Sequence, residues 1–193
     1  MFSSIQAVYR GDPAARHLEV ILYQGLWAIW LHRMAHILYR WSLPFFPRLL
    51  SQVSRFLTQI EIHPGARIGR GVFIDHGAGL VIGETAQIGD GCILFHGVTL
   101  GGTGSSHGKR HPTLERHVVA GPGAKIMGNI ALGEYSRIGA NAVVIVDVPP
   151  HSTVVGNPGR VVAQAGLRLD TELEHGELPD PLLLSIQTLD RRI

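Results

Sequence analysis

The sequence predicts an α+β fold in which an N-terminal helical segment precedes a parallel β-helix of hexapeptide repeats. An aliphatic or small apolar residue returns every sixth position, with one two-residue slip and one longer interruption. Neither an α-helix nor a half-buried strand has this period, whereas each flat side of a hexapeptide β-helix contributes one inward aliphatic residue. The series is Ile62, Ile68, Ile74, Ile82, Ile88, Leu94, Leu100, Leu114, Ala120, Ile126, Leu132, Ile138 and Val144.

Two further regularities support the solenoid. Glycine directly follows the aliphatic residue in many hexads, and we expect these glycines to take positive φ at tight corners. A small or slim residue comes four positions after the aliphatic one, as in Ala66, Cys92 and Ala124. Cys92 is the only cysteine, so we expect a packed thiol that forms no intrachain disulfide. The glycines are Gly69, Gly83, Gly89, Gly121, Gly133 and Gly139.

The segment 1–60 follows helical rules. Asp12 before Pro13 predicts a helix N-cap, and Leu18, Ile21 and Leu22 would share one face of that helix. The apolar series continues at helical spacing, and Pro44 and Pro47 separate it from a last helix. Later members of the series are Leu26, Ile29, Trp30, Met34, Ile37 and Leu38, then Leu50, Val53 and Leu57 in the last helix.

Residues 61–165 form the predicted β-helix, which a Gly-rich insertion from Gly101 to Pro112 interrupts as one extruded loop. Insertions in a strict repeat collect on a binding face, so we expect the loop to be functional. The segment 166–193 loses the period and reads as a C-terminal tail. The predicted domains are therefore 1–60, 61–165 and 166–193.

Composition limits the possible functions. The chain has 193 residues and a formal net charge of +2, and it shows no basic stripe with interleaved aromatics, so we do not expect it to bind nucleic acid. The most apolar stretch, from Val20 to Leu31, is too short to cross a bilayer. The sequence opens with no secretory signal pattern, so we expect a soluble cytoplasmic protein.

Polar residues that break the repeat are the first candidates for chemistry. Asp75 and His76 stand at a corner immediately before the two-residue slip, and Glu61 precedes the first hexad on the same coil. A carboxylate next to an imidazole fixes its tautomer and suits a general base near neutral pH. A solvated corner histidine with an unrelated Glu61 is the alternative, and the spacing does not decide between them.

The loop supplies Lys109, Arg110 and His111. A guanidinium offers a rigid fork for a carboxylate, although a mobile, solvated basic loop is the alternative. His32 and His36 stand four residues apart, a spacing that can bind a metal, but we favour a packed helix face because no third ligand is near in the sequence.

Together these motifs resemble the serine O-acetyltransferases over nearly all of residues 1–165. The family's β-helix is left-handed, so the resemblance implies a left-handed solenoid. The motifs are Arg10-Gly-Asp-Pro-Ala14, His32-Arg-Met-Ala-His36, Glu61-Ile-His-Pro-Gly-Ala66, Asp75-His-Gly-Ala-Gly79, Gly83-Glu-Thr-Ala86, Gly97-Val-Thr-Leu-Gly-Gly-Thr-Gly104, Arg110-His-Pro112 and Gly156-Asn-Pro158.

The resemblance implies transfer of acetyl from acetyl-CoA to the hydroxyl of L-serine in cysteine biosynthesis. His76 matches the family's catalytic base, and Glu61 stands where the family often has the Asp that orients it. Residues matching the serine site are Asp12 and Asp75 for the ammonium group and Arg110 and His111 for the carboxylate. Residues matching the CoA site are Gly102, Thr103, Pro122 and Ala140, with Lys125 as a possible phosphate contact or a solvated corner lysine.

The resemblance also implies partners. We expect acetyl-CoA as a co-substrate with no tightly bound cofactor and no metal, and L-cysteine as a feedback inhibitor competing with serine. CoA sites between solenoids require a homotrimer, and longer family members pair two trimers through their helical segments. Family members commonly end in isoleucine, which binds O-acetylserine sulfhydrylase, so Ile193 is the expected partner-binding residue.

Three other functions remain open at this stage. A sugar or antibiotic acetyltransferase would share the repeats and a catalytic histidine, but it would not need Asp12, Asp75 and Arg110 for a zwitterion. A zinc-dependent γ-type carbonic anhydrase would draw histidine ligands from neighbouring subunits. A scaffold without catalytic function would have no use for His76 and the loop.

Overall fold

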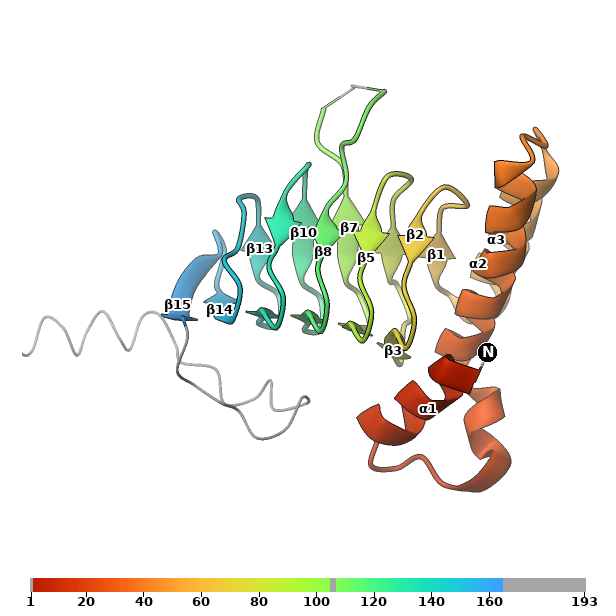
Figure 1. Cartoon of the computed structure of the whole chain (residues 1–193), viewed down its shortest axis with the longest axis horizontal. Helices are drawn as coiled ribbons and strands as arrows, with labels where there is room; N and C mark the ends of the chain where they lie inside the picture. The colour runs from red at the N-terminus through yellow and green to blue at the C-terminus, as the bar shows by residue number, and fades with distance from the viewer. Residues whose placement is uncertain (1, 105–106, 165–193) are drawn as a thin grey trace, which may run out of the picture.

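The computed structural model describes residues 2–104 and 107–164, and the predicted tail 166–193 lies outside them. Its helices lie together at one end of a solenoid of short strands (Figure 1). The helices are α1 (Phe2–Gly11), the 3-10 helix η1 (His17–Leu22), α2 (Gln24–Arg40) and α3 (Phe46–Thr58). The first strand begins at Glu61, three residues after α3 ends.

The strands stack into three sheets, one for each flat side of the solenoid. Sheet A contains β1 (Glu61–Ile62), β4 (Val81–Ile82), β7 (Thr99–Gly101), β10 (Lys125–Met127) and β13 (Val143–Val144). Sheet B contains β2 (Arg67–Ile68), β5 (Gln87–Ile88), β8 (Thr113–Leu114) and β11 (Ala131–Leu132). Sheet C contains β3 (Phe73–Asp75), β6 (Ile93–Phe95), β9 (Val119–Ala120), β12 (Arg137–Ile138), β14 (Ser152–Val155) and β15 (Arg160–Gln164).

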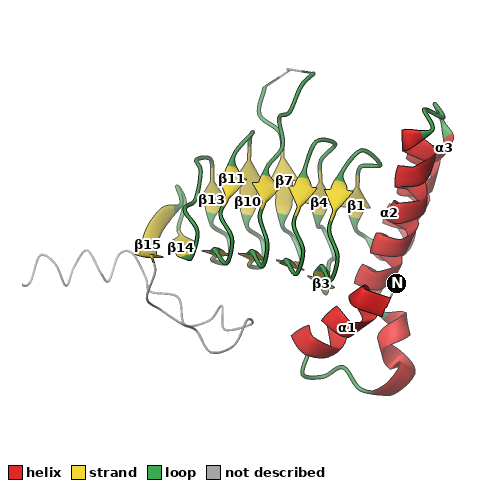
Figure 2. Ribbon diagram, viewed as in Figure 1, coloured by secondary structure: helices red, strands yellow, loops and turns green. Residues whose placement is uncertain are grey.

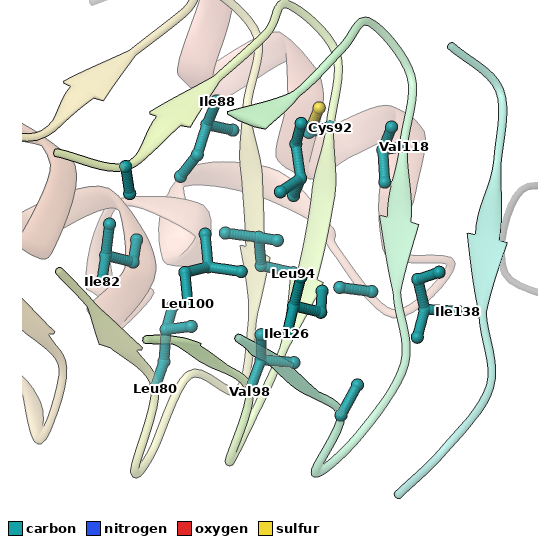
Figure 3. Close-up of a cluster of buried hydrophobic side chains, with 14 of the residues drawn as sticks. Leu80, Ile82, Ile88, Cys92, Leu94, Val98, Leu100, Val118, Ile126 and Ile138 are labelled. Atoms are coloured by element: carbon teal, nitrogen blue, oxygen red, sulfur yellow. The ribbon is translucent and has the colours of Figure 1, made fainter. Parts of the chain in front are cut away.

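Neighbouring strands in each sheet are parallel, except that β15 pairs antiparallel with β14 at the end of the stack. Every aliphatic position of the predicted hexad series lies in a strand, and all but Ile68 are at most 4% exposed. Their side chains fill the interior between the sheets, as Figure 3 shows for Ile82, Leu94 and Ile126. The predicted solenoid is confirmed.

Cys92 illustrates the small-residue position of the repeat. Its side chain is fully buried, and its thiol donates to the backbone oxygen of Glu115 over 2.9 Å. Burial raises the pKa of the Cys92 thiol to about 12. The expectation of a packed thiol is therefore confirmed.

The prediction about the corner glycines was wrong. The glycines that follow the aliphatic residue do not have positive φ, which instead occurs two residues later, at Gly71 and Gly91 and also at non-glycine residues such as His117. Close packing explains the glycines. A Cβ on Gly69 would lie 2.4 Å from Oδ1 of Asp90, so the next coil leaves no room for a side chain.

The first coil is two residues longer than a regular coil of the solenoid, and this enlarges one corner. Glu61 pairs with Val81, twenty residues on, whereas Val81 pairs with Thr99, eighteen residues on. The two extra residues lie between β3 and β4, in the corner that begins with His76. Leu80 is fully buried there and keeps the interior filled.

The insertion predicted as an extruded loop leaves the solenoid between β7 and β8, and Figure 2 shows it projecting from that corner. It joins sheet A to sheet B. The corner one coil earlier, between β4 and β5, contains Glu84 and Thr85 and lies against the base of the loop, because Thr85 hydrogen-bonds with Arg110 and His111.

The helices reach sheet C through a second, smaller core that includes Val8, Leu26 and Phe73. Two glycines make this approach close. A Cβ on Gly11 would lie 2.4 Å from the Phe73 ring, and one on Gly25 would lie 2.4 Å from the backbone oxygen of Ile74. The chain between α1 and α2 is thereby held next to the corner that follows β3.

The predicted helix at Asp12 is corrected. Asp12 follows the last residue of α1 and accepts from the N–H of Ala14 in a turn, so it does not cap a helix. The segment that follows is the 3-10 helix η1, in which Leu18 and Leu22 are about four-fifths exposed. The Asp12-Pro13 pair resembles the start of a helix in the sequence, but here Pro13 lies in the turn that follows the end of α1.

The most exposed apolar residues of the helical segment include several on α3. The residues that α3 buries are Pro47, Ser51, Ser54 and Thr58, whereas Val53, Phe56 and Leu57 are 44%, 86% and 66% exposed. Met34 and Ile37 of α2 are likewise at least half exposed. No described residue of the same copy covers these apolar side chains.

His32 and His36 pack on α2 with ring centroids 5.7 Å apart. Burial lowers the pKa of His32 to about 3, and Nδ1 of His36 lies 2.7 Å from the backbone oxygen of Pro64. Among the described residues, no cluster of three or more His, Cys, Asp or Glu side chains is arranged to hold a metal ion. No helix in that part of the chain combines the length and the apolar character that crossing a membrane requires.

Candidate active site

The first group of candidate residues lies at the enlarged corner between sheets C and A. Asp75 ends β3, and His76 follows in a left-handed conformation with φ of 57°. This backbone turns the His76 side chain outward, and 76% of it is exposed. Nε2 of His76 lies 3.7 Å from Oδ1 of Asp75, and the His96 ring of the next coil is 6.2 Å away between centroids.

Asp12 faces this corner from the helical segment. Oδ2 accepts a 2.5 Å hydrogen bond from the hydroxyl of Tyr23, and Oδ1 accepts from the N–H of Ala14. The bond to Asp12 is the main reason why the pKa of Tyr23 is raised to about 12, so the phenol stays protonated and donates. A cavity of about 430 Å³ is lined by Asp12, Tyr23, Asp75 and His76.

The electrostatics of this cavity favour a cation. Burial raises the pKa of Asp75 and the negative charge of Asp12 raises it further, while His76 opposes the shift. Two carboxylates in one small cavity repel each other, and an ammonium group between them would relieve that repulsion. The structure thus brings Asp12, Asp75 and His76 together, as predicted for an amine-binding site beside a base.

The structure does not bring Glu61 to His76. The Glu61 carboxylate lies 3.6 Å from Nη2 of Arg48 and 3.4 Å from Nε of Arg55, both on α3. The carboxylate that lies beside His76 is Asp75. The spacing placed Glu61 on the correct coil, but two guanidinium groups on α3 attract its side chain away from the corner.

Arg110 lies at the next corner of the solenoid, between sheets A and B. Its Nη2 donates to Oε2 of Glu84 over 2.5 Å, and the Tyr39 hydroxyl donates to the other oxygen of Glu84 over 3.3 Å. The hydrogen bond from Arg110 is the largest cause of a lowered pKa at Glu84. Glu84 therefore stays ionised and holds one edge of the Arg110 guanidinium.

His111 is more buried than its neighbour, with only 8% of the residue exposed. Nδ1 of His111 accepts from the backbone N–H of Thr85 over 3.2 Å and lies 2.9 Å from its hydroxyl. A Cβ on Gly83 would lie 2.0 Å from the His111 ring, so only glycine fits beneath it. Burial lowers the pKa of His111, and the acceptor role of Nδ1 leaves the proton on Nε2 as a donor.

The residues predicted to hold CoA lie on the same two corners and on the sheet between them. Pro122 and Ala140 follow β9 and β12 at the corner between sheets C and A, and Gly102 and Thr103 open the loop at the corner between sheets A and B. Lys125 is on β10 of sheet A, where Nζ donates to the backbone oxygen of Gly97 over 2.5 Å.

All predicted substrate residues of the solenoid therefore border or lie on sheet A. Asp75 and His76 lie at one edge of this sheet, and Arg110 and His111 lie at the other edge. The helical residue Asp12 joins the first group. One copy of the chain thus carries these two groups of candidate residues at opposite edges of sheet A.

Sequence reasoning missed Tyr23, Glu84 and Thr85 as contributors. Glu84 and Thr85 belong to the Gly83-Glu-Thr-Ala86 motif, which was the available signal, but nothing in the spacing showed that they contact a loop about 25 residues later. Tyr23 carried no signal, because its contact with Asp12 depends on how α2 packs on sheet C.

Comparison with known proteins identifies the family. Residues 111–145 match the bacterial transferase hexapeptide family of six repeats. A serine acetyltransferase from Synechococcus elongatus is 55% identical over 199 residues, covering 100% of this chain and 81% of the relative. One from Bacillus subtilis is 56% identical over 191 residues, covering 98% and 88%. The chain belongs to the serine acetyltransferase family. It is therefore an acyltransferase.

Solved structures agree with this membership. The serine acetyltransferase of Brucella abortus in complex with coenzyme A has a TM-score of 0.83 at 46% identity, covering 86% of this chain and 68% of that one. Two further serine acetyltransferases, at 40% and 41% identity with TM-scores of 0.81 and 0.82, were solved with serine and with cysteine. The chain thus shares both sequence and fold with the family.

Proposed function

We propose that this protein transfers the acetyl group of acetyl-CoA to the hydroxyl of L-serine, giving O-acetyl-L-serine and CoA for cysteine biosynthesis in the cytoplasm. Given that the chain belongs to the serine acetyltransferase family, the proposal rests on one observation. Carboxylates and an imidazole border one edge of sheet A, and a guanidinium borders the other edge. Carboxylates for an ammonium group and a guanidinium for a carboxylate are complementary to an α-amino acid, which carries both groups on its Cα, once the two edges belong to neighbouring copies.

The reaction requires a base and two charged anchors. Asp12 and Asp75 bind the ammonium group, while Arg110 and the Nε2 proton of His111 bind the carboxylate. His76 removes the hydroxyl proton as the serine oxygen attacks the thioester carbonyl. Collapse of the tetrahedral intermediate breaks the carbon–sulfur bond, and the departing CoA thiolate takes the proton from His76.

A complete site requires more than one copy of the chain. Because the two groups of candidate residues, which we call half-sites, lie at opposite edges of sheet A, a threefold axis facing this sheet would place the His76 edge of one copy beside the Arg110 edge of the next. The exposed apolar face of α3, with Val53, Phe56 and Leu57, supports this assembly, since it needs a cover. We therefore propose a homotrimer, and Met34 and Ile37 of α2 offer a surface on which two trimers can pair.

Two carboxylates compete for the role of orienting His76. Asp75 is next to the imidazole, and Glu61 reaches it only if its side chain leaves Arg48 and Arg55. We retain Glu61 as a proposed catalytic residue by family resemblance. The comparison of Glu61→Gln with Asp75→Asn decides, because loss of the orienting carboxylate lowers kcat, whereas loss of an ammonium anchor mainly raises KM for serine.

Acetyl-CoA would lie along sheet A between neighbouring copies. Gly102, Thr103, Pro122 and Ala140 border this path, and Lys125 on β10 supplies a cation for a phosphate. We propose acetyl-CoA as a co-substrate that leaves as CoA in each cycle. The protein then needs no tightly bound cofactor and no metal for this chemistry.

Two regulatory partners complete the proposal. L-Cysteine differs from serine at one atom and should compete for the same anchors, which inhibition competitive with serine would demonstrate. Ile193 lies outside the described residues, and we propose that it binds O-acetylserine sulfhydrylase through its side chain and free carboxylate. Deleting Ile193 should abolish that binding without changing acetyl transfer, and a tail peptide that fails to bind the sulfhydrylase would withdraw the partnership.

The direct test is release of the CoA thiol with defined acceptors. Serine should support turnover, whereas ethanolamine lacks the carboxylate and 3-hydroxypropionate lacks the ammonium group, so both should be poor substrates. A galactoside and chloramphenicol test the alternative acetyltransferases on the same scaffold. Faster turnover with either of these than with serine would reject the proposed function.

A further inference from the structure

Lys109 forms hydrogen bonds that hold the base of the extruded loop against the solenoid. Nζ of Lys109 donates to the backbone oxygens of Thr85, His111 and Pro112 over 2.8, 2.5 and 3.2 Å. An ammonium group has three protons, so all its donors are used by backbone groups. The carbonyls of His111 and Pro112 belong to the end of the loop that returns to the solenoid, and the carbonyl of Thr85 belongs to the preceding coil. Lys109 therefore links the loop to that coil.

The environment of Lys109 differs from that of a solvated lysine. The residue is only partly exposed, and burial lowers the pKa of its ammonium group. Hydrogen bonds from a charged donor are stronger than those from a neutral one. Lys109 therefore acts as a fixed cation in the loop, contrary to the sequence-based alternative in which the basic loop is mobile and solvated.

Thr85 holds the same segment of the loop from the opposite side, and we call Lys109 and Thr85 together the clamp. Its Oγ1 accepts from the backbone N–H groups of Arg110 and His111 over 3.0 and 3.1 Å. The carbonyl of His111 thus points to Lys109 while its N–H points to Thr85, and this fixes the orientation of the peptide chain. The directions in which the Arg110 and His111 side chains leave the backbone follow from that orientation.

We propose that Lys109 is a positioning residue for recognition of the substrate carboxylate, acting through Arg110 and His111. This rests on the proposed function, in which those two side chains bind the carboxylate of serine. Lys109 itself has no free proton for the substrate. Its removal should therefore weaken binding of substrates that carry a carboxylate and leave the chemistry at His76 largely intact.

The test replaces Lys109 with Cys and rebuilds the ammonium group chemically. Alkylation of Lys109→Cys with 2-bromoethylamine gives a side chain of nearly the length of lysine with its charge, and 2-bromoethanol gives a neutral control of the same length. The native Cys92 should not react, because it is fully buried and its thiol has a pKa of about 12. Alkylated wild-type protein controls for modification elsewhere.

We expect Lys109→Cys to raise KM for serine about tenfold or more, as loss of several charge-assisted hydrogen bonds predicts, with a smaller change in kcat. The ratio of kcat/KM for serine to that for ethanolamine should fall, because ethanolamine has no carboxylate to position. Aminoethylation should restore both quantities, and hydroxyethylation should not. An unchanged ratio, or equal rescue by both reagents, would overturn the proposal.

A second measurement separates this proposal from the proposed function. Amide hydrogen exchange at Arg110 and His111 reports the clamp without any turnover. It should accelerate in Lys109→Cys and slow again after aminoethylation. If wild-type protein fails to acetylate serine while exchange behaves as expected, the proposed function fails and carboxylate positioning fails with it. If serine is acetylated but exchange is unaffected by the substitution, Lys109 alone is wrongly assigned.

Discussion

Replacing Tyr23 with Phe removes a single hydroxyl from the proposed serine site. That hydroxyl donates to Oδ2 of Asp12 over 2.5 Å, and the remaining oxygen of Asp12 keeps its bond from the N–H of Ala14. A hydrogen bond to a charged group contributes about 1.5–3 kcal/mol, and about 1.4 kcal/mol corresponds to a tenfold change in binding. With one of two anchors retained, we expect KM for serine to rise about tenfold.

The assay is the initial rate of thiol release with serine varied at saturating acetyl-CoA, and then the reverse. KM for acetyl-CoA and kcat should change little, because the hydroxyl contacts neither the thioester path nor His76. Tyr135→Phe is a matched control, since Tyr135 stacks between His117 and His151 at the corner between sheets B and C. Either of two results for Tyr23→Phe would refute the reasoning: an unchanged KM for serine would mean that the hydroxyl does not contribute to serine binding, and a lowered KM would mean that it competes with the ammonium group.

Two other substitutions test the site and the solenoid. Burial and the charge of Asp12 raise the pKa of Asp75 in the folded protein above its pKa in the unfolded chain. Ionised Asp75 therefore lowers the stability of the fold at pH values above the folded pKa, and this cost disappears as the pH falls below the unfolded pKa. Asp75→Asn should therefore stabilise the protein against urea near pH 7 and lose this advantage in acid. It should also raise KM for serine. Destabilisation near pH 7 would contradict the predicted sign of the stability change. Leu94→Ala should lower the free energy of unfolding by about 3 kcal/mol, because Leu94 is fully buried, whereas Val146→Ala at an exposed position should change it little. Urea denaturation at one protein concentration measures both, and equal effects of the Leu94 and Val146 substitutions would contradict the assigned core.

The solenoid could be predicted because each hexad encodes its own inward side chain. Ile82, Leu94 and Ile126 point inward as a consequence of local spacing, whatever the rest of the chain does. The corner at Asp75 and His76 was predictable for the same reason, since a slip in a strict period marks a longer coil. The reason for the corner glycines was not predictable, because it depends on the atoms of the next coil, such as Asp90 above Gly69.

Contacts between distant segments were the part that spacing could not supply. Glu84 meets Arg110 only because the loop returns across the corner below it, and Glu61 meets Arg55 only because α3 packs beside sheet A. The apolar pattern of α3 correctly predicted a helix, but it could not say whether Phe56 is covered by this copy or another one. Amphipathic periodicity reports that a face is apolar and leaves its partner unspecified.

The central claim is that each active site combines the His76 edge of one copy with the Arg110 edge of its neighbour. Mixing two variants that are impaired in different halves of the site tests it most directly. His76→Ala and Arg110→Ala each retain one intact half-site, so trimers assembled at random from equal amounts should contain complete sites at about one quarter of the positions. The two variants are unfolded together and refolded, with each refolded alone as a control.

At a serine concentration far below the KM of Arg110→Ala, the account predicts thiol release in the mixture at about one quarter of the wild-type rate per chain, with each variant alone far slower. This activity should scale with the product of the two variants' fractions as their ratio is changed. If each chain carried a complete site of its own, every site in the mixture would keep one defect. Mixed trimers with no more activity than the separate variants would therefore contradict the account.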